Sequence, residues 1–167
     1  MSDKIKTLEQ TLNSDGFAIT AEIPAPISAS CVEMEEKIDL LKGYVHAVNV
    51  TDNPGATAHM SSLAGCNIVR NKGIDPIFQV TCRDRNRLAI QSDLMGASAL
   101  GINNVLTLAG DPIKNGDQAD AKAVFDINSK KILSIMQSMN DDGETMSGRE
   151  LQSRSKFFPA GAAIIHE

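Results

Sequence analysis

The stretch Asn104-Val105-Leu106-Thr107-Leu108-Ala109-Gly110-Asp111-Pro112 is a short apolar run that ends in turn-forming residues. An apolar run of this kind, without regular polar alternation, is typical of a parallel strand that is covered on both faces or lines a barrel. Four more such runs occur, at Phe17–Ile23, Tyr44–Val50, Pro76–Thr81 and Phe157–Ile165. Helical patterns separate them, and this alternation indicates βα units that build a parallel sheet.

The spacing of these runs indicates the kind of parallel sheet. The first four begin at residues 17, 44, 76 and 104, so their starts lie 27, 32 and 28 residues apart. A (β/α)8 barrel of about 250 residues uses roughly 30 residues for each βα unit. The sequence therefore predicts an α/β fold of the TIM-type (β/α)8 barrel family. It is an incomplete barrel, because residues 1–167 supply about five βα units, all in one domain.

Helices are predicted between the runs from caps and from apolar residues at helical spacing. Ser30-Cys31-Val32-Glu33 has the form of a capping box, and the helix that it starts should end near Gly43. The other helices are predicted from Met60, Leu63, Ala64 and Ile68, from Asp84 as an N-cap with an end near Gly101, and from Ile132, Ile135, Met136 and Met139. The polar stretches 110–126 and 140–156 are predicted to be loops.

Composition and charge exclude several classes of protein. With 42% apolar and 22% charged residues, the chain has the profile of a globular domain rather than a disordered one. It has neither a membrane-length apolar stretch nor a secretory start, and its cysteines (Cys31, Cys66 and Cys82) predict neither disulfides nor a metal site. A net charge of −5 without a basic run argues against a nucleic-acid surface. We expect a cytoplasmic protein that acts on a small molecule, without membrane or nucleic-acid partners.

Polar and small residues stand at the points where four predicted strands end. The carboxyl ends of barrel strands form one rim, and barrel enzymes have their active sites at that rim. We therefore expect these residues to lie close together despite their separation in sequence. They are Glu22, Thr51, Asp52, Gln79, Thr81, Ala109, Gly110 and Asp111.

The motifs at these strand ends resemble those of a known family. Glu-x-Pro-x-Pro at 22–26, Val-Thr-Asp at 50–52, Thr-Cys-Arg-Asp-Arg-Asn at 81–86 and Gly-Asp-Pro at 110–112 are similar, in order and spacing, to methylenetetrahydrofolate reductases. The resemblance implies a barrel that binds FAD on its carboxyl-terminal rim. It also implies hydride transfer from the flavin N5 to the methylene carbon of methylenetetrahydrofolate, which yields methyltetrahydrofolate. NAD(P)H or a protein electron donor would reduce the flavin.

The same resemblance implies roles for individual residues. Glu22 resembles the acid that assists opening of the folate's imidazolidine ring to an iminium ion, a role that needs a carboxyl group protonated near neutral pH. Partial burial against flavin and pterin rings favours that state. Asp111 resembles the acidic residue that holds the pterin and tunes the flavin. Cofactor contacts are implied for Thr51, Asp52, Gln79, Thr81, Ala109, Gly110, Asp111, Ala123 and Val124.

Without the resemblance, these residues have simpler interpretations. Glu22 would be an exposed carboxylate in an ion pair, and Gly110-Asp111-Pro112 would be a turn. Thr51, Asp52 and Thr81 would start loops or cap helices, and Ala123-Val124 would only lead into a helix. The family often has His and Arg where this chain has Gln79 and Ala109, so the expected contact with the flavin differs here.

Three arginines alternate along one short segment, at positions 83, 85 and 87. Residues two apart do not share a helix face, so they do not predict an anion clamp. We expect Arg83, Arg85 and Arg87 to be solvated or paired with Asp84 and Asp93.

A barrel of five units leaves unpaired strand edges and, we expect, an apolar inner face open to water. The chain should therefore form a homo-oligomer or bind a complementing chain. We expect a reductase of this family that is a truncated or fragment chain, and two functional alternatives stand beside this expectation. One is a non-catalytic half-barrel that assembles with itself or a partner, and the other is a different pterin-binding barrel, such as a folate-linked methyltransferase.

Overall fold

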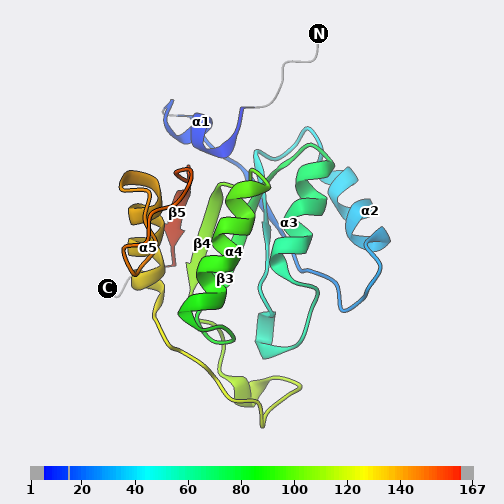
Figure 1. Ribbon diagram of the computed structural model, residues 1–167. Helices are drawn as coiled ribbons and strands as arrows, with labels where there is room; N and C mark the ends of the chain where they lie inside the picture. Colours follow the sequence, from blue (N-terminus) through cyan, green and yellow to red (C-terminus); the bar gives the residue numbers. More distant parts are fainter. Residues whose placement is uncertain (1–5, 15, 163–167) are drawn as a thin grey trace, which may run out of the picture.

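The computed structural model describes residues 6–14 and 16–162 of the chain. Five parallel strands form one sheet in the order β1-β2-β3-β4-β5, with neighbours in space that are also neighbours in sequence (Figure 1). The strands are β1 Thr20–Ile23, β2 Ala47–Val50, β3 Asp75–Thr81, β4 Asn104–Leu108 and β5 Phe158–Gly161. All four pairings are parallel, as the sequence predicts.

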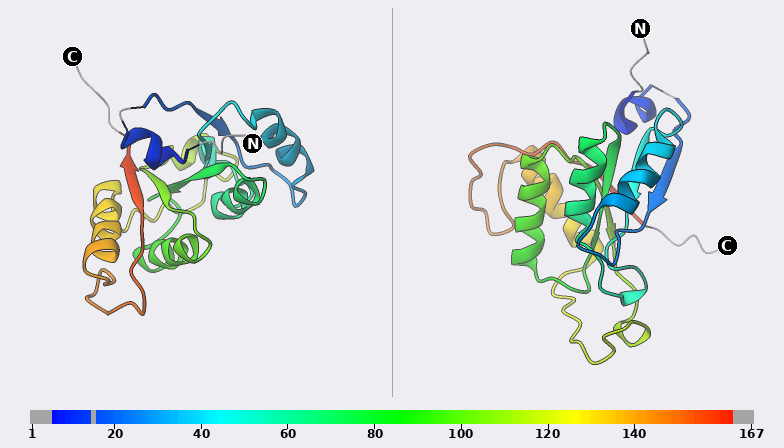
Figure 2. Two further views of the ribbon diagram at one scale, coloured as in Figure 1. Left: turned by 90° about the horizontal axis from the view of Figure 1, so that it is seen from above. Right: turned by 90° about the vertical axis from the view of Figure 1, so that its right-hand side faces the viewer.

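Four helices pack along one face of the sheet, and a short helix lies at the amino-terminal end of the strands (Figure 2). The helices are α1 Leu8–Leu12, α2 Val32–Leu41, α3 Ser62–Asn71, α4 Arg87–Ala99 and α5 Ser129–Asp141. Two 3-10 turns, η1 Pro54–Ala56 and η2 Ile113–Asn115, follow β2 and β4. No helix in the described ranges has the length and apolar character needed to cross a membrane.

The predicted strands are confirmed in number, order and direction, and their ends differ by a few residues. β4 has the predicted bounds, whereas β1 and β2 each begin three residues later than predicted. β5 ends at Gly161, and the last part of the predicted run, from residue 163, lies outside the described residues.

Two predicted helix starts are wrong, and each has a local cause. The N-cap of α2 is Cys31, and the Ser30 side chain instead accepts a weak hydrogen bond from the Val32 amide at 3.4 Å. The N-cap of α4 is Asn86, whose side chain accepts from two backbone amides of the first turn at 3.1 Å each. Asp84 is not available as a cap because it pairs with Arg83.

The buried face of α3 also differs from the predicted one. Its fully buried positions are Ser62, Gly65, Cys66 and Val69, whereas the predicted Ala64 is exposed and Met60 precedes the helix. The cause is close packing on β2, since a Cβ atom added at Gly65 would lie 2.7 Å from Val50 Cγ1. The predicted face of α5 is confirmed, with Ile132, Ile135, Met136 and Met139 all buried.

Strand register assigns the two faces of the sheet. Ile23, Val50, Phe78 and Val105 occupy one row across β1 to β4 and belong to the main core beneath the helices. The adjacent row on the opposite face consists of Glu22, Asn49, Ile77 and Asn104. Three of the four side chains in this row are polar, so the inner face is mixed rather than uniformly apolar.

Helix α1 covers the amino-terminal end of that inner face. Leu8 packs in a small cluster with Ala47 and Ile77. The Leu8 amide also donates to the Asp75 carboxylate at 3.1 Å. This end of the inner face is thus closed by side chains, and the other end carries the candidate site.

Candidate active site

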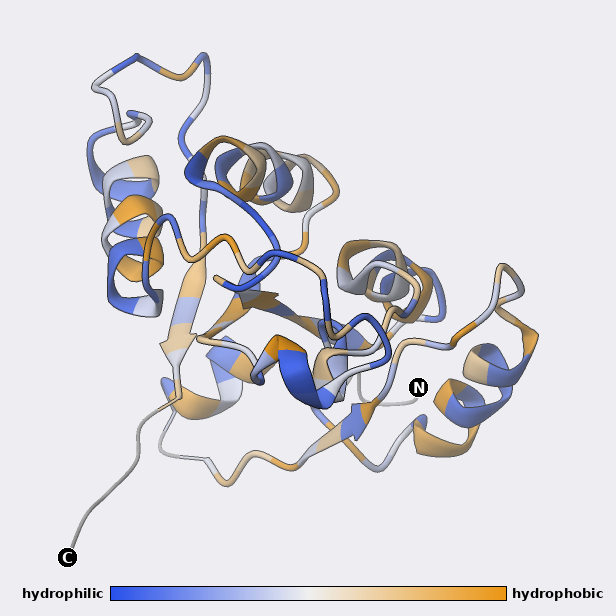
Figure 3. Cartoon of the chain, turned by 90° about the horizontal axis from the view of Figure 1, so that it is seen from below, coloured by the Kyte–Doolittle hydropathy of each residue, from blue (hydrophilic) through white to orange (hydrophobic). Residues whose placement is uncertain are grey.

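A hollow of about 320 Å3 lies at the carboxyl ends of the strands, the end towards the viewer in Figure 3. The predicted convergence of the strand ends is confirmed, because Glu22 after β1 and Asp111 after β4 line the same hollow. The complete lining is Glu22, Thr51, Asp52, Pro54, Gln79, Thr81, Arg83, Leu108, Ala109, Gly110 and Asp111. It contains every predicted strand-end residue.

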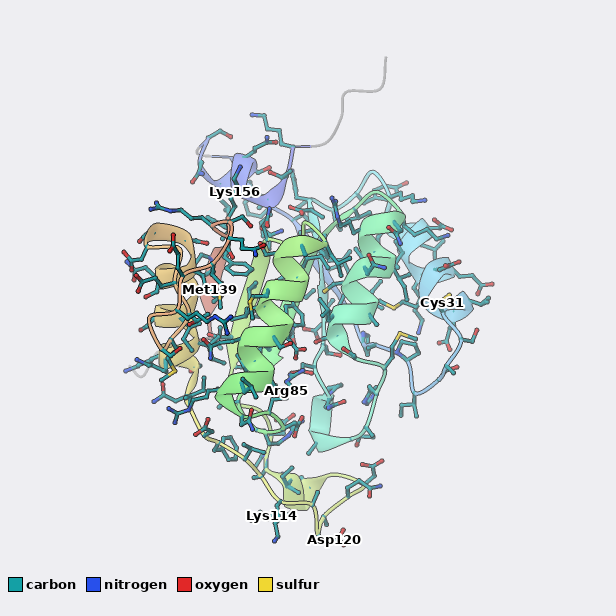
Figure 4. The ribbon with its side chains drawn as sticks, viewed as in Figure 1. Cys31, Arg85, Lys114, Asp120, Met139 and Lys156 are labelled. Carbon is teal, nitrogen blue, oxygen red and sulfur yellow. The ribbon has the colours of Figure 1, made fainter. Side chains whose placement is uncertain are left out.

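Ala123 and Val124 do not line this hollow. Val124 is 42% exposed, and its amide donates to the Arg83 carbonyl at 2.8 Å. Both residues belong to the long loop between β4 and α5, whose far tip carries Lys114 and Asp120 (Figure 4). A cofactor contact at Ala123 and Val124 stays a prediction.

Glu22 of β1 and Gln79 of β3 form a pair across β2 in the lining of the hollow. The Gln79 amide nitrogen donates to Glu22 Oε2 at 3.0 Å. Gln79 is 6% exposed, so its amide has a fixed position, whereas Glu22 is exposed. Within the described residues Glu22 forms no ion pair, which argues against its interpretation as a surface salt bridge. The pair gives the hollow one carboxyl group that a buried amide orients.

Thr51 and Asp52 have different environments although they are adjacent in sequence. Asp52 is buried, and one of its carboxylate oxygens accepts from the Thr81 amide at 2.8 Å, from the Thr81 hydroxyl at 2.9 Å and from Arg85. That carboxylate therefore holds the end of β3. The Thr51 hydroxyl is buried beside the hollow and has no hydrogen-bond partner among the described residues. Buried polar atoms normally have partners, so the unpartnered hydroxyl marks Thr51 as a candidate ligand contact.

Asp111 connects two of the loops around the hollow. One of its carboxylate oxygens accepts from the Gly55 amide at 2.8 Å, and Gly55 lies in η1 after β2. The residue before it, Gly110, has φ +96°, a left-handed conformation that glycine adopts without strain. The Gly110-Asp111-Pro112 motif is therefore more than a local turn, because its acid fixes the neighbouring loop.

Arg83 is a site residue that the sequence prediction missed. Its side chain is 1% exposed and pairs with Asp84 at 2.6 Å, so the expected pairing is confirmed but the expected solvation is wrong. Hydrogen bonding to Asp84 raises the pKa of Arg83 above its ordinary value. Burial opposes ionisation of Asp84, yet hydrogen bonds from Arg83 and Asn53 outweigh it and lower the pKa of that carboxyl. The sequence signal for this ion pair was the adjacency of Arg83 and Asp84.

The other two arginines form ion pairs nearby. Arg85, labelled near the start of α4 in Figure 4, pairs with Asp93 at 3.3 Å as predicted and also with Asp52. Arg87 pairs with Asp126 at 2.7 Å, a partner that the sequence did not indicate. This second pair attaches the end of the long loop to α4.

Comparison with known families agrees with this geometry. The sequence model of the family described as "Methylenetetrahydrofolate reductase" matches residues 7–149. The chain belongs to the methylenetetrahydrofolate reductase family. The resemblance and the fold class are thereby confirmed: β1 to β4 lie within the matched residues, and β5 extends the same parallel sheet.

One relative is Methylenetetrahydrofolate reductase 1 of Schizosaccharomyces pombe. It is 26% identical over 122 residues, which are 71% of this chain and 20% of the relative. The chain thus spans about a fifth of the length of that reductase.

The hollow of this methylenetetrahydrofolate reductase family member has the size of a small-ligand site. Small-molecule sites measure about 300–1,000 Å3, so the hollow is at the small end of that range. The unpartnered Thr51 hydroxyl offers one polar contact. The one cation in the described lining is Arg83, and protein groups already engage it, so a pyrophosphate finds no free cation there. The described residues contain no cluster of His, Cys, Asp and Glu suited to a metal ion.

Proposed function

We propose that this site reduces methylenetetrahydrofolate to methyltetrahydrofolate with FAD as its cofactor. The observation that carries the proposal is the gathering of Glu22, Thr51, Gln79 and Asp111 around one hollow in a member of this reductase family. Two carboxyl groups, a buried amide and a free hydroxyl match a ligand with ring nitrogens and carbonyl groups. Family membership supports the same substrate.

Each residue has a distinct proposed task. Glu22, oriented by Gln79 at 3.0 Å, delivers a proton to the folate nitrogen that leaves the methylene carbon. Asp111 holds the pterin through the carboxylate oxygen that Gly55 does not engage. Thr51 donates its free hydroxyl to the flavin or the pterin. The bound flavin supplies the hydride for the methylene carbon. Together the proton and the hydride complete the reduction.

The remaining predictions from the sequence form part of this proposal. NAD(P)H or a protein electron donor reduces the flavin, and residues 1–167 act as one partial barrel domain. A second copy or a complementing chain covers the open edges of β1 and β5, each of which pairs with one strand only among the described residues. Cytoplasmic location and the absence of a nucleic-acid partner stay predictions from composition.

The test uses the purified protein supplied with FAD under anaerobic conditions. The flavin on the protein is reduced chemically and methylenetetrahydrofolate is added. The folate products are then separated, identified and quantified by mass spectrometry. We expect methyltetrahydrofolate and oxidised flavin in equal amounts. Methyl transfer from added methyltetrahydrofolate without flavin would support the methyltransferase alternative instead. Flavin and folate binding without turnover would support the non-catalytic half-barrel.

A further inference from the structure

Arg83 is the largest fully buried side chain in the described part of the chain. A buried guanidinium is tolerated only when its N–H groups have acceptors. Arg83 Nε and Nη2 donate to the two carboxylate oxygens of Asp84 at 2.6 and 2.7 Å. Nη2 also donates to the Asn53 carbonyl at 3.0 Å, and Nη1 donates to the Asp111 carbonyl at 3.2 Å. All but one of its N–H donors are thus engaged.

These partners belong to three different loops around the hollow. Asn53 follows β2, Asp84 follows β3 and Asp111 follows β4. Two direct hydrogen bonds also join the loops. The side-chain amide of Asn53 donates to the Asp84 carboxylate at 3.1 Å, and the backbone amide of Gly55 donates to the Asp111 carboxylate at 2.8 Å. Arg83 is the member that touches all three loops.

The loop after β2 needs such support because its backbone is strained. Ala56 has φ 57°, in the left-handed region that alanine rarely adopts, and Asn53, a residue type that adopts it occasionally, has φ 46°. Conformations of this kind persist only where surrounding contacts hold them, and they are common at functional sites. The Arg83 bond to the Asn53 carbonyl acts at the start of the strained segment.

The arrangement also decides between two possible tasks for Arg83. An arginine that binds an anionic substrate keeps several donors free towards the ligand, whereas Arg83 has committed nearly all of them to protein acceptors. Its planar fork matches the Asp84 carboxylate and two carbonyls at once, which a lysine ammonium does not do. The side chain therefore suits positioning rather than direct ligand binding.

We propose that Arg83 is the positioning residue of the hollow, and that its guanidinium fixes the loops after β2 and β4 so that Thr51 and Asp111 face the same ligand. Its importance for catalysis rests on the proposed function, whereas its effect on the loops does not. The two effects are therefore measured separately.

The first measurement is amide hydrogen exchange in the full chain, on wild type, R83M, R83K and the control R87M. R87M removes an arginine that also pairs with a carboxylate, but this carboxylate, Asp126, lies at the far end of the loop after β4, and Arg87 has no bond to 53–57 or 110–116 among the described residues. In R83M we expect exchange in peptides covering 53–57 and 110–116 to rise by about tenfold or more, because segments that lose their anchoring bonds open more often. R83K should resemble R83M, since its point charge lacks the fork.

Peptides from α2 and α3 separate this effect from a general loss of stability. A variant that is only less stable would exchange faster in these helices as well, whereas loss of positioning affects the two loops alone. Exchange in both loops that stays at the wild-type level in R83M would overturn the proposal, as would full restoration by R83K. If R83M does not fold, R83K and D84N provide the same comparison.

The second measurement is steady-state reduction of methylenetetrahydrofolate. We expect R83K to lower kcat/KM by about a hundredfold with a raised KM, as when catalytic groups are slightly displaced. A wild-type protein without this activity would refute the proposed function, and the exchange data would still decide the role of Arg83. Faster loop exchange with unchanged kcat/KM in an active protein would refute positioning of the catalytic groups.

Discussion

Replacement of Gly110 by Ala tests how tightly the end of β4 packs against the rim. Gly110 has φ +96°, and a Cβ atom there would lie 2.9 Å from Arg83 Cβ and 3.3 Å from Thr81 Cβ. A left-handed conformation costs an alanine about 1–2 kcal/mol. Overpacking adds about 1–3 kcal/mol, because both contacts involve Cβ atoms that cannot rotate away. We expect G110A to lose about 2–5 kcal/mol of unfolding free energy.

Gly43→Ala is the matched control. Gly43 has φ +85°, but nothing lies within 4 Å of the position of its added Cβ, so only the conformational cost applies. Urea unfolding followed by circular dichroism measures both variants. With a slope of about 2 kcal/mol per molar urea, the midpoint of G110A should lie about 0.5–1.5 M below that of G43A. Equal midpoints would refute the close packing of Gly110 on Arg83.

Three further predictions concern other parts of the molecule. G116A should separate η1 from η2, because a Cβ atom at residue 116 would lie 1.9 Å from the Ala56 carbonyl oxygen. Limited proteolysis should then cut the 110–126 loop faster than in wild type. An unchanged cleavage rate would count against this contact. Burial raises the pKa of the Cys66 and Cys82 thiols. A thiol reagent at neutral pH should therefore label the partly exposed Cys31 in the native protein and all three cysteines after denaturation. Rapid labelling of Cys66 in the native protein would contradict its burial. Hydrogen bonds from Arg87 lower the pKa of Asp126 from an ordinary 3.8 to about 2, so this pair stabilises the fold above the ordinary value and loses its effect as the pH falls through about 2. The Asp126 carboxyl should titrate by NMR near 2 in wild type and higher in R87M; equal midpoints would show that Arg87 has no such effect.

Strand order and the gathering of the site followed from local sequence patterns. β4 was predicted to the residue because Val105-Leu106-Thr107-Leu108 lies between an Asn pair and Gly110. In a parallel sheet with sequential order, the carboxyl ends meet at one rim, so Glu22 and Asp111 could be placed together without coordinates.

The parts that could not be predicted depend on contacts between distant segments. Arg83 is buried because acceptors arrive from 30 residues before it and 28 residues after it, and nothing within its own segment indicates them. The start of α4 differs for a local reason instead, since the adjacent Arg83 engages Asp84 and Asn86 takes over as cap. Helix α1 has only five residues; its one local signal is the capping box of Thr7 and Gln10, and its position depends on Leu8 and the bond to the distant Asp75.

The most direct test of the central claim is single-turnover oxidation of reduced flavin by methylenetetrahydrofolate in wild type and E22Q. Glu22 lies in the hollow beside Gln79, and removal of a general acid typically slows a reaction by about 10²–10⁴-fold. We predict a loss of that size in E22Q with unchanged flavin affinity. The control E33Q, at an exposed glutamate of α2 paired with Lys37, should react at the wild-type rate. Flavin oxidation in E22Q as fast as in E33Q would contradict the assignment of this hollow as the reductase site.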